Sequence, residues 1–314
     1  MSSPVRGKQC TALARLVAGL HAGVACDTRA LRMENANVID SVATCPETDA
    51  LREFIDRHPR LFVLSGAGCS TGSGIPDYRD AEGAWKRTPP ITLSVFLDQP
   101  MQRARYWARS MIGWQRFGTA TPNRGHRALA LLEQRDRIEG VLTQNVDGLH
   151  QAAGSRNVID LHGRMDTIGC LACEERTPRQ ALQQRLLAAN PSWAMLDAAV
   201  APDGDADLER ADFSDFVIPA CELCGGIVKP DVVFFGENVP RERVDTAMAW
   251  LANCDAMLVV GSSLMVYSGY RFAVAAQRLG KPVAAINRGV TRADDLLDLK
   301  IDDDCSDALV SLLD

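Results

Sequence analysis

Two Cys-x-x-Cys pairs are the residues of this chain whose spacing points most directly to chemistry. They are Cys170 with Cys173 and Cys221 with Cys224, and 47 residues separate the pairs. Each pair can supply two thiolates to one ion, and four thiolates make a structural zinc site. Two disulfides or a redox-active pair are the alternatives, although an intracellular setting disfavours disulfides. Because four protein ligands leave no open coordination position, we expect this zinc to be structural.

A glycine-rich turn follows the short apolar run at residues 61–64. Its sequence is Gly66-Ala-Gly-Cys-Ser-Thr-Gly-Ser-Gly74. Such glycines let the backbone approach a pyrophosphate, and a following helix N-terminus can bind that group. However, Thr71 stands where the dinucleotide fingerprint has its third glycine, and no acidic residue clearly ends a second strand about 20 residues later. The turn therefore indicates either a nucleotide site or an ordinary tight strand-to-helix turn, and it disfavours a plain hydride-transfer dehydrogenase.

The next motif, Gly74-Ile-Pro-Asp-Tyr-Arg79, combines a stiff turn with opposite charges. Pro76 restricts the backbone. Asp77 and Arg79 could lie beside a phosphate or a ribose. A surface turn closed by a salt bridge is the alternative interpretation.

Two further motifs place polar side chains directly after apolar runs. Gln144, Asn145 and Asp147 follow residues 140–143, and buried polar groups are costly unless they are hydrogen-bonded. They suit a ligand with hydroxyl and amide groups, such as a ribose and a carboxamide, although Asn145 or Asp147 could instead cap a helix. His162 ends another run and has the side chain best suited to general-base work near neutral pH. A lone histidine is usually structural, but this setting favours catalysis.

Short apolar runs alternate with helical patterns along the chain. The expected strands are residues 61–64, 140–143, 157–159, 232–235, 256–260 and 281–286, and the expected helices include 122–134, 241–252 and 269–279. This alternation predicts an α/β fold with a Rossmann-like parallel sheet and helices on both faces. Small or polar residues follow nearly every strand, and ligands of open α/β sheets bind beyond the carboxyl ends of the strands. We therefore expect one shared crevice.

Residues 166–225 interrupt the alternation, since this segment contains both cysteine pairs and a helical middle at 178–190. Its loop at residues 201–206 is expected to be exposed. We predict an N-terminal extension over 1–44, a Rossmann-like domain over 45–165 and 226–314, and a small zinc-binding module over 166–225.

Composition narrows the functional classes. A net charge of -6 over 314 residues argues against a general nucleic-acid binder. Ten cysteines are too few for a disulfide scaffold, and no apolar run approaches the ~20 residues of a membrane span. The first 32 residues carry five basic residues and one acidic residue. We interpret them as an extension without assigned chemistry, or as the result of a start site placed too early with Met33 as the true start, and we expect a cytoplasmic protein. A secretory signal or a transit peptide, the latter implying a mitochondrial protein, is the alternative.

Taken in order, these motifs resemble the sirtuin family of NAD-dependent protein deacylases, over roughly residues 49–314. The match also covers Lys229-Pro-Asp-Val-Val-Phe-Phe-Gly-Glu237 and Gly261-Ser-Ser263. Three runs look like the class II branch of that family: Arg105-Tyr-Trp-Ala-Arg109, Ala201-Pro-Asp-Gly-Asp205 and Tyr267-Ser-Gly-Tyr-Arg-Phe272.

The resemblance implies a protein-lysine deacetylase or deacylase that cleaves NAD at the nicotinamide bond and transfers the acyl group to ADP-ribose. It implies a Rossmann-like NAD-binding domain, one structural zinc ion and acyl-lysine proteins as partners, without nucleic acid or membrane. The implied catalytic residues are His162 and Asn145. The implied NAD-binding residues are Gly66, Ala67, Gly68, Ser70, Pro76, Asp77, Tyr78, Arg79, Gln144, Asn145, Val146, Asp147, Gly261, Ser262, Ser263, Asn287, Arg288, Gly289 and Cys305. The substrate peptide would add as a strand beside Val233, Phe234, Phe235, Gly236, Glu237 and Val266.

Departures from the family pattern bear on the acyl group. Trp85 stands where desuccinylases carry a small residue, and Tyr106 with Arg109 has their Tyr-x-x-Arg spacing but belongs to the class II-like run. We therefore expect no succinyl preference, while a lipoamidase-type preference for long acyl groups stays open. In the glycine turn, Cys69 replaces the isoleucine often seen there. Protein mono-ADP-ribosylation in the same crevice and a non-enzymatic zinc-binding module are the alternative functions.

Overall fold

The computed structural model describes residues 46–196, 205–206, 208 and 212–313 of the chain. The predicted extension 1–44 and most of the loop at 201–206 therefore lie outside the described residues. The described strands are β1 (Leu61–Ser65), β2 (Ile138–Thr143), β3 (Val158–Asp160), β4 (Gly163–Cys170), β5 (Arg176–Pro178), β6 (Val228–Val232), β7 (Ala256–Val260), β8 (Val283–Ile286) and β9 (Leu299–Ile301). The α-helices are α1 (Pro46–Arg57), α2 (Leu93–Asp98), α3 (Pro100–Phe117), α4 (Arg124–Gln134), α5 (Leu149–Ala153), α6 (Arg179–Ala189), α7 (Pro191–Ala194), α8 (Arg241–Asn253), α9 (Tyr267–Arg278) and α10 (Cys305–Val310), and η1 (Ala67–Ser73) and η2 (Asp294–Leu296) are 3₁₀ turns.

Six strands form a parallel sheet in the order β3-β2-β1-β7-β8-β9. The chain runs from β1 outward to β3 on one side, and then from β7 outward to β9 on the other. The strand order therefore reverses between β1 and β7, and open α/β sheets bind ligands at such a reversal.

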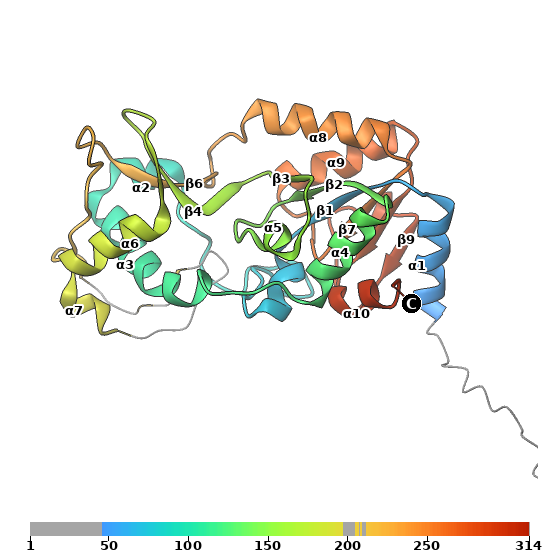
Figure 1. Ribbon diagram of the computed structural model, residues 1–314, viewed down its shortest axis with the longest axis horizontal. Helices are drawn as coiled ribbons and strands as arrows, with labels where there is room; N and C mark the ends of the chain where they lie inside the picture. The colour runs from blue at the N-terminus through green and yellow to red at the C-terminus, as the bar shows by residue number, and fades with distance from the viewer. Residues whose placement is uncertain (1–45, 197–204, 207, 209–211, 314) are drawn as a thin grey trace, which may run out of the picture. The chain divides into compact units, whose positions relative to one another are not determined.

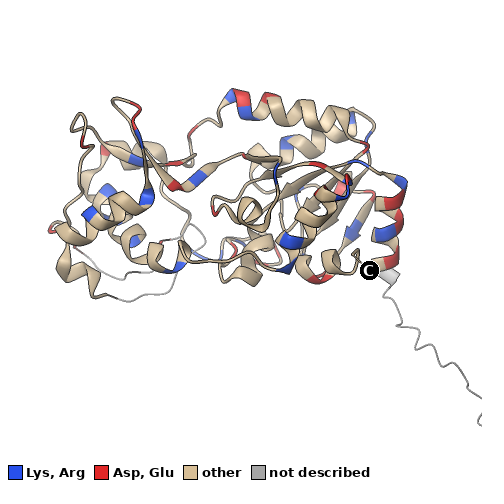
Figure 2. Ribbon diagram, viewed as in Figure 1, with Lys and Arg blue, Asp and Glu red and all other residues tan. Residues whose placement is uncertain are grey.

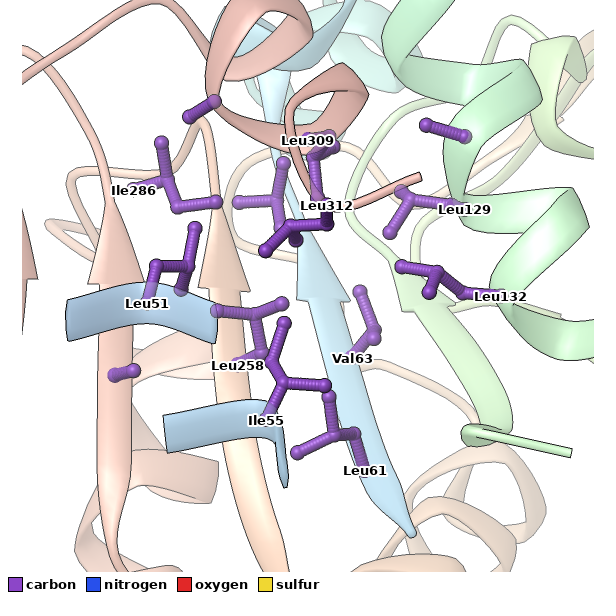
Figure 3. Close-up of a cluster of buried hydrophobic side chains, with 14 of the residues drawn as sticks. Leu51, Ile55, Leu61, Val63, Leu129, Leu132, Leu258, Ile286, Leu309 and Leu312 are labelled. Carbon is purple, nitrogen blue, oxygen red and sulfur yellow. The ribbon is translucent and has the colours of Figure 1, made fainter. Parts of the chain in front are cut away.

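Helices cover both faces of this sheet, which confirms the predicted Rossmann-like α/β fold. Figure 1 shows α8 and α9 on one side of the sheet and α4 and α10 on the other. Side chains of β1 alternate between two cores: Leu61 and Val63 pack with α1, α4 and α10, whereas Phe62 and Leu64 pack with α8 and α9. Figure 3 shows the first core, in which Leu309 and Leu312 from the C-terminal end lie over the sheet between α4 and α1. A strand buried on both sides reads as a continuous apolar run, as residues 61–64 do.

The outer faces of the helices carry mixed charge. Figure 2 shows acidic and basic residues interspersed along α1 and in the first part of α8. Both helices have ion pairs one turn apart, between Arg57 and Glu53 and between Arg241 and Asp245, as is typical of solvent-facing helix surfaces. Among the described residues, no helix is both long and apolar enough to cross a membrane.

A second, three-stranded sheet has the order β5-β4-β6 and is antiparallel. The predicted strand at residues 232–235 is wrong, because the strand is β6, Val228–Val232, and it belongs to this small sheet. Beyond Val232 the backbone leaves the strand: the amide of Phe234 donates to Glu237 Oε2 at 2.9 Å and the amide of Leu93 donates to the carbonyl of Phe235 at 2.9 Å. Residues 233–237 therefore form a separate loop at the end of β6.

The core under the small sheet is shared with α2 and α3. It joins Phe96 and Trp107 from these helices to Leu182, Trp193 and Phe234. The boundaries predicted for the small module, 166–225, stay a prediction, but the packing adds α2 and α3 to its core.

The expectation of an exposed loop at 201–206 is wrong for its last two residues. Asp205 and Ala206 are buried, with 2% and 0% of their surface exposed. Ala206 exchanges two hydrogen bonds with Arg109, one from its amide to the backbone carbonyl at 2.8 Å and one from Arg109 Nε to its own carbonyl at 2.7 Å. Arg109 is thereby used to hold this segment.

Candidate active site

A cleft of about 430 Å³ opens at the reversal point of the strand order. Most of the residues that the sequence assigned to cofactor, catalysis and peptide lie in its wall, although they come from segments far apart in the chain. Those in the wall are Gly66, Ala67, Gly68, Ser70, Asp77, Tyr78, Arg79, Gln144, Asn145, Val146, Asp147, His162, Val233, Phe234, Phe235, Gly236, Glu237, Gly261, Ser262, Ser263, Val266, Asn287 and Arg288. Three assigned residues do not line it: Pro76, Gly289 and Cys305. The Cys305 thiol instead donates to the carbonyl of Ile286 at 3.6 Å.

The glycine turn after β1 lies directly against the turn after β7. The amide of Gly66 donates to the carbonyl of Val260 at 3.0 Å, and the amide of Gly68 donates to that of Gly261 at 2.9 Å. A side chain at Gly66 would come within 2.7 Å of Ser262 Cβ, and one at Gly68 within 3.0 Å of Gly261 Cα. Glycine at these two positions therefore lets two strand ends meet and leaves backbone amides beside the cleft, as a pyrophosphate site requires.

Asn145, Asp147 and Ser70 form one hydrogen-bonded group at the base of the cleft. Asn145 Nδ2 donates to the carbonyl of Gly66 and to Ser70 Oγ, each at 3.0 Å. The Ser70 hydroxyl donates to Asp147 Oδ2 at 2.7 Å. The other Asp147 oxygen accepts from the amide of Leu149, the first residue of α5, at 2.9 Å, while the N-cap residue of this helix is Gly148. Neither Asp147 nor Asn145 is therefore the N-cap residue, and their contact with a ligand stays a prediction.

Gln144 connects this group to the far wall. Its Nε2 donates to Ser262 Oγ at 2.7 Å. A side chain on Gly269 would lie 2.4 Å from Gln144 Oε1, so the start of α9 packs closely against this amide. Gln144 is thereby fixed in one orientation.

His162 follows β3 and has partners on both ring nitrogens. Nδ1 lies 2.9 Å from the carbonyl of Gln144 and Nε2 lies 2.8 Å from Ser268 Oγ. Because a carbonyl oxygen can only accept, Nδ1 carries the proton and Nε2 presents its lone pair. Burial lowers the pKa of His162 to about 4. The hydrogen bond to the carbonyl of Gln144 raises this pKa, whereas the positive charges of Arg243 and Arg271 lower it further. At neutral pH the ring is therefore uncharged and can accept a proton at Nε2.

Ser268 was not among the residues assigned from the sequence. We expect Ser268→Ala to raise the pKa of His162, because a hydroxyl that donates to Nε2 stabilises the neutral ring. The acid limb of the kcat/KM–pH profile should then move from near pH 4 to higher pH, since activity requires the neutral base and kcat/KM reports the free enzyme. Ser268→Thr, which keeps the hydroxyl, should retain the wild-type limb. Coincident acid limbs for all three proteins would contradict this role.

The turn at residues 74–79 closes one side of the cleft with charged and aromatic groups. Asp77 pairs with Lys86 at 2.5 Å rather than with Arg79. The Arg79 guanidinium stacks 3.9 Å above the Trp85 ring, and Trp85 meets Phe235 edge-on at 5.8 Å. The turn therefore both lines the cleft and takes part in a salt bridge, and Trp85 fills space beside the loop at residues 233–237.

The loop at residues 233–237 is anchored by an ion pair between buried Lys229 and half-buried Glu237. Lys229 Nζ lies 3.0 Å from Glu237 Oε2, and the same oxygen accepts from the amide of Phe234. Lys229 also donates to the carbonyl of Val232. Both partners of the pair thus have further hydrogen bonds, which fixes the shape of the loop.

The four cysteines come together at the tip of the small sheet. Cys170 Sγ lies 3.4 Å from Cys224 Sγ, and Cys173 Sγ lies 3.8 Å from Cys221 Sγ. All four sulfur atoms lie within 4.8 Å of one another. Four thiolates at about 2.3 Å from one ion stand about 3.8 Å apart, so the set fits a tetrahedral zinc ion. The shortest contacts join one cysteine from each pair, as expected for four ligands of a single ion.

Two further histidines, His126 and His150, are buried beside the glycine turn. His126 is the third residue of α4 and forms a capping box with Asn123, and its Nε2 lies 3.5 Å from Ser70 Oγ. His150 Nε2 lies 2.7 Å from Ser65 Oγ, and burial lowers the pKa of His150 to about 3. Both rings therefore support the turn while uncharged.

Comparisons with known proteins agree with this geometry. Residues 66–268 match the model of the Sir2 family. The chain is 62% identical, over 272 residues that cover 87% of it and 93% of the relative, to an "NAD-dependent protein deacetylase" of Xanthomonas campestris pv. campestris (strain 8004). A solved structure described as "Structural Basis for the Mechanism and Regulation of Sir2 Enzymes" is similar with a TM-score of 0.68 and 32% identity, over 85% of this chain and 96% of that one. Another, described as "Sir2-p53 peptide-NAD+", has a TM-score of 0.66 and 28% identity, over 85% of this chain and 97% of that one.

Proposed function

This chain belongs to the Sir2 family and is an NAD-dependent protein deacetylase, and we propose that it removes acyl groups from lysine side chains in the cleft between β1 and β7. The observation that carries the proposal is the neutral His162 held beside the Gln144–Asp147 group, opposite the glycine turn. The proposed reaction cleaves the glycosidic bond to nicotinamide and transfers the acyl group to a ribose hydroxyl. It needs an uncharged base, amide side chains in fixed positions and a backbone turn that approaches the cofactor closely.

The residues present fit NAD. Gly66 and Gly68 leave space that a Cβ would fill, so the glycine turn would bind the pyrophosphate together with Ala67 and Ser70. Gln144, Asn145 and Asp147 would surround the nicotinamide and its ribose, and Ser262, Ser263, Asn287 and Arg288 would bind the adenosine half. When bound, NAD supplies the ribose carbon that the amide oxygen attacks and accepts the acyl group.

In this proposal, the protein's main contribution is orientation. Asn145 is held by Gly66 and Ser70, and Gln144 by Ser262, so little side-chain freedom is lost on binding. Attack by a weak amide oxygen depends on such placement. His162 takes the proton of a ribose hydroxyl at Nε2. For this step, the hydrogen bond that Nε2 accepts from the Ser268 hydroxyl must first be replaced by one from the ribose hydroxyl.

The acyl-lysine peptide would enter between residues 233–237 and 264–268 and pair with them as an additional strand. The Lys229–Glu237 ion pair gives the first of these segments a fixed shape. Pairing through the backbone reads little sequence, which fits a range of protein substrates.

We further propose that Cys170, Cys173, Cys221 and Cys224 hold one structural zinc ion that stabilises the small sheet. Their mutual distances support this ligand set. The chain is also proposed to be a class II sirtuin, on the runs at residues 105–109, 201–205 and 267–272. Arg109 is occupied by Ala206, which supports the expectation that Tyr106 and Arg109 do not form a succinyl-reading pair.

An acyl-lysine peptide panel tests the proposal. Acetyl, propionyl, succinyl and lipoyl versions of one peptide are incubated with NAD, and nicotinamide and free-lysine peptide are quantified by mass spectrometry. We expect NAD-dependent release of the acetyl group and no preference for succinyl. Release of the lipoyl group with higher kcat/KM would favour the lipoamidase-type alternative. ADP-ribose left covalently on protein, with no acyl transfer, would favour mono-ADP-ribosylation instead.

A further inference from the structure

Arg271 is a cation in the cleft wall without a counter-ion. It lies on α9 and lines the cleft. Among the described residues it has neither an ion-pair nor a hydrogen-bond partner: its Nε is buried and unpaired, and its one contact of note is the Tyr267 ring, 5.3 Å from Cζ. A partly buried guanidinium in this state has lost part of its hydration without compensation.

Among the described residues, the other two arginines that line the cleft have partners, which makes Arg271 an exception there. Arg288 lies 3.7 Å from Asp303 and 3.9 Å from Asp304. Arg79 donates to the carbonyl of Gly83 at 2.7 Å and stacks on Trp85. A cation left open in a ligand cleft, where its neighbours are paired, is suited to an anionic group of the ligand.

The position of Arg271 relates it to the substrate rather than to the phosphates of NAD. It lies one helical turn after Ser268, whose hydroxyl contacts His162, and it follows directly on residues 264–268, beside which the peptide is proposed to bind. The phosphates are assigned to the glycine turn after β1. Tyr267, which Arg271 touches, is 60% exposed, so this part of the wall is at the rim of the cleft.

A second arginine reinforces the positive charge at this rim. Arg292 lies 5.9 Å from the Tyr267 ring and 4.4 Å from the Tyr270 ring. Its Nη1 donates to the carbonyl of Met265 at 3.2 Å, within the proposed peptide-binding segment. Two guanidinium groups and two tyrosines thus border the same short stretch.

We propose that Arg271, with Arg292 against the same Tyr267 ring, forms a carboxylate subsite that selects peptides with an aspartate or glutamate next to the acyl-lysine. The inference rests on the proposed deacylase function and names its substrate class. An acidic acyl group would offer the same chemistry, but Trp85 packs against Phe235 where such a group would need room, so the peptide side chain is the favoured source.

Matched acetyl peptides test the subsite. The peptides of each pair differ only at one position beside the acetyl-lysine, which carries glutamate in one peptide and glutamine in the other. KM and kcat for each peptide are measured at saturating NAD. At one or more positions we expect the wild-type protein to show a KM roughly tenfold lower for glutamate than for glutamine, as for a charge-assisted hydrogen bond. In Arg271→Gln this ratio should fall to about one, and in Arg271→Lys it should be partly restored. Arg278→Gln, at the exposed end of the same helix, should keep the wild-type ratio.

The remaining outcomes distinguish the alternatives. If Arg271→Gln lowers only the activity on a succinyl-lysine peptide with neutral flanks, the acyl group and not the peptide supplies the carboxylate. If the variant raises KM for NAD and leaves the glutamate-to-glutamine ratio intact, the arginine serves the cofactor and the inference is overturned. A wild-type ratio of one at every position also overturns it. Absence of activity on every acetyl peptide would refute the proposed function, which is a separate result.

Discussion

His162→Ala is expected to lower kcat/KM for an acetyl peptide by roughly 100- to 10,000-fold, the usual contribution of a positioned general base. The side chain is uncharged at neutral pH, presents Nε2 to the cleft and is oriented through Nδ1 by the carbonyl of Gln144. The change should fall mainly on kcat, because most of the residues proposed to bind the peptide and the cofactor are left unchanged. Steady-state kinetics at pH 7.5 measures it.

The control for this prediction is His58→Ala. His58 Nδ1 lies 2.7 Å from the carbonyl oxygen of Phe54, and the side chain does not line the cleft. We expect it to retain wild-type kinetics, and both variants should retain their zinc and their thermal unfolding midpoint. A His162→Ala protein that is folded and keeps most of its kcat would remove the proposed base from the mechanism.

Cys221→Ser has the second large expected effect, on stability rather than on chemistry. Structural zinc sites contribute binding energy directly to folding, on the order of 10 kcal/mol in isolated zinc modules. Cys221 is buried and its Sγ lies 3.8 Å from that of Cys173. Loss of one thiolate should release the ion and loosen the core shared by the small sheet with α2 and α3. Elemental analysis should fall from about one zinc per chain towards zero, and the unfolding midpoint should drop.

Cys254→Ser provides a matched control, because Cys254 is also buried, at 2% exposed, but lies in the core with α8 and α9. It should lose some stability and keep the zinc. If instead Cys221→Ser retained a full complement of metal, or if the wild-type protein contained none and its four thiols were oxidised in pairs, the ligand set would be wrong.

Much of the large sheet could be predicted because its strands are nearly continuous apolar runs. Residues 256–260 form β7 as expected, and residues 61–64 form most of β1. The strand predicted at residues 232–235 failed for a physical reason. Its apolar residues serve the core of the small sheet and a loop anchored by Glu237, and a single sequence does not distinguish these uses from a strand of the main sheet.

The polar residues at the strand ends could be predicted, because Gln, Asn, Asp and His directly after buried strands are typical of a ligand-binding site. The hydrogen bond from Gly68 to Gly261 is seen only in the structure. Ser268 and Arg271 could not be predicted in this way. Serine at the beginning of a helix has many ordinary uses, and its contact with His162 joins residues 106 positions apart. The lack of a counter-ion for Arg271 becomes visible only when the neighbouring carboxylates have been placed.

The most direct test of the central claim is the product balance of the acetyl-peptide reaction, followed by mass spectrometry with NAD in excess. We expect nicotinamide, free-lysine peptide and acetyl-ADP-ribose to form in equal amounts, and none of them to form without NAD. Nicotinamide without deacetylated peptide, or free acetate in place of acetyl-ADP-ribose, would contradict this claim.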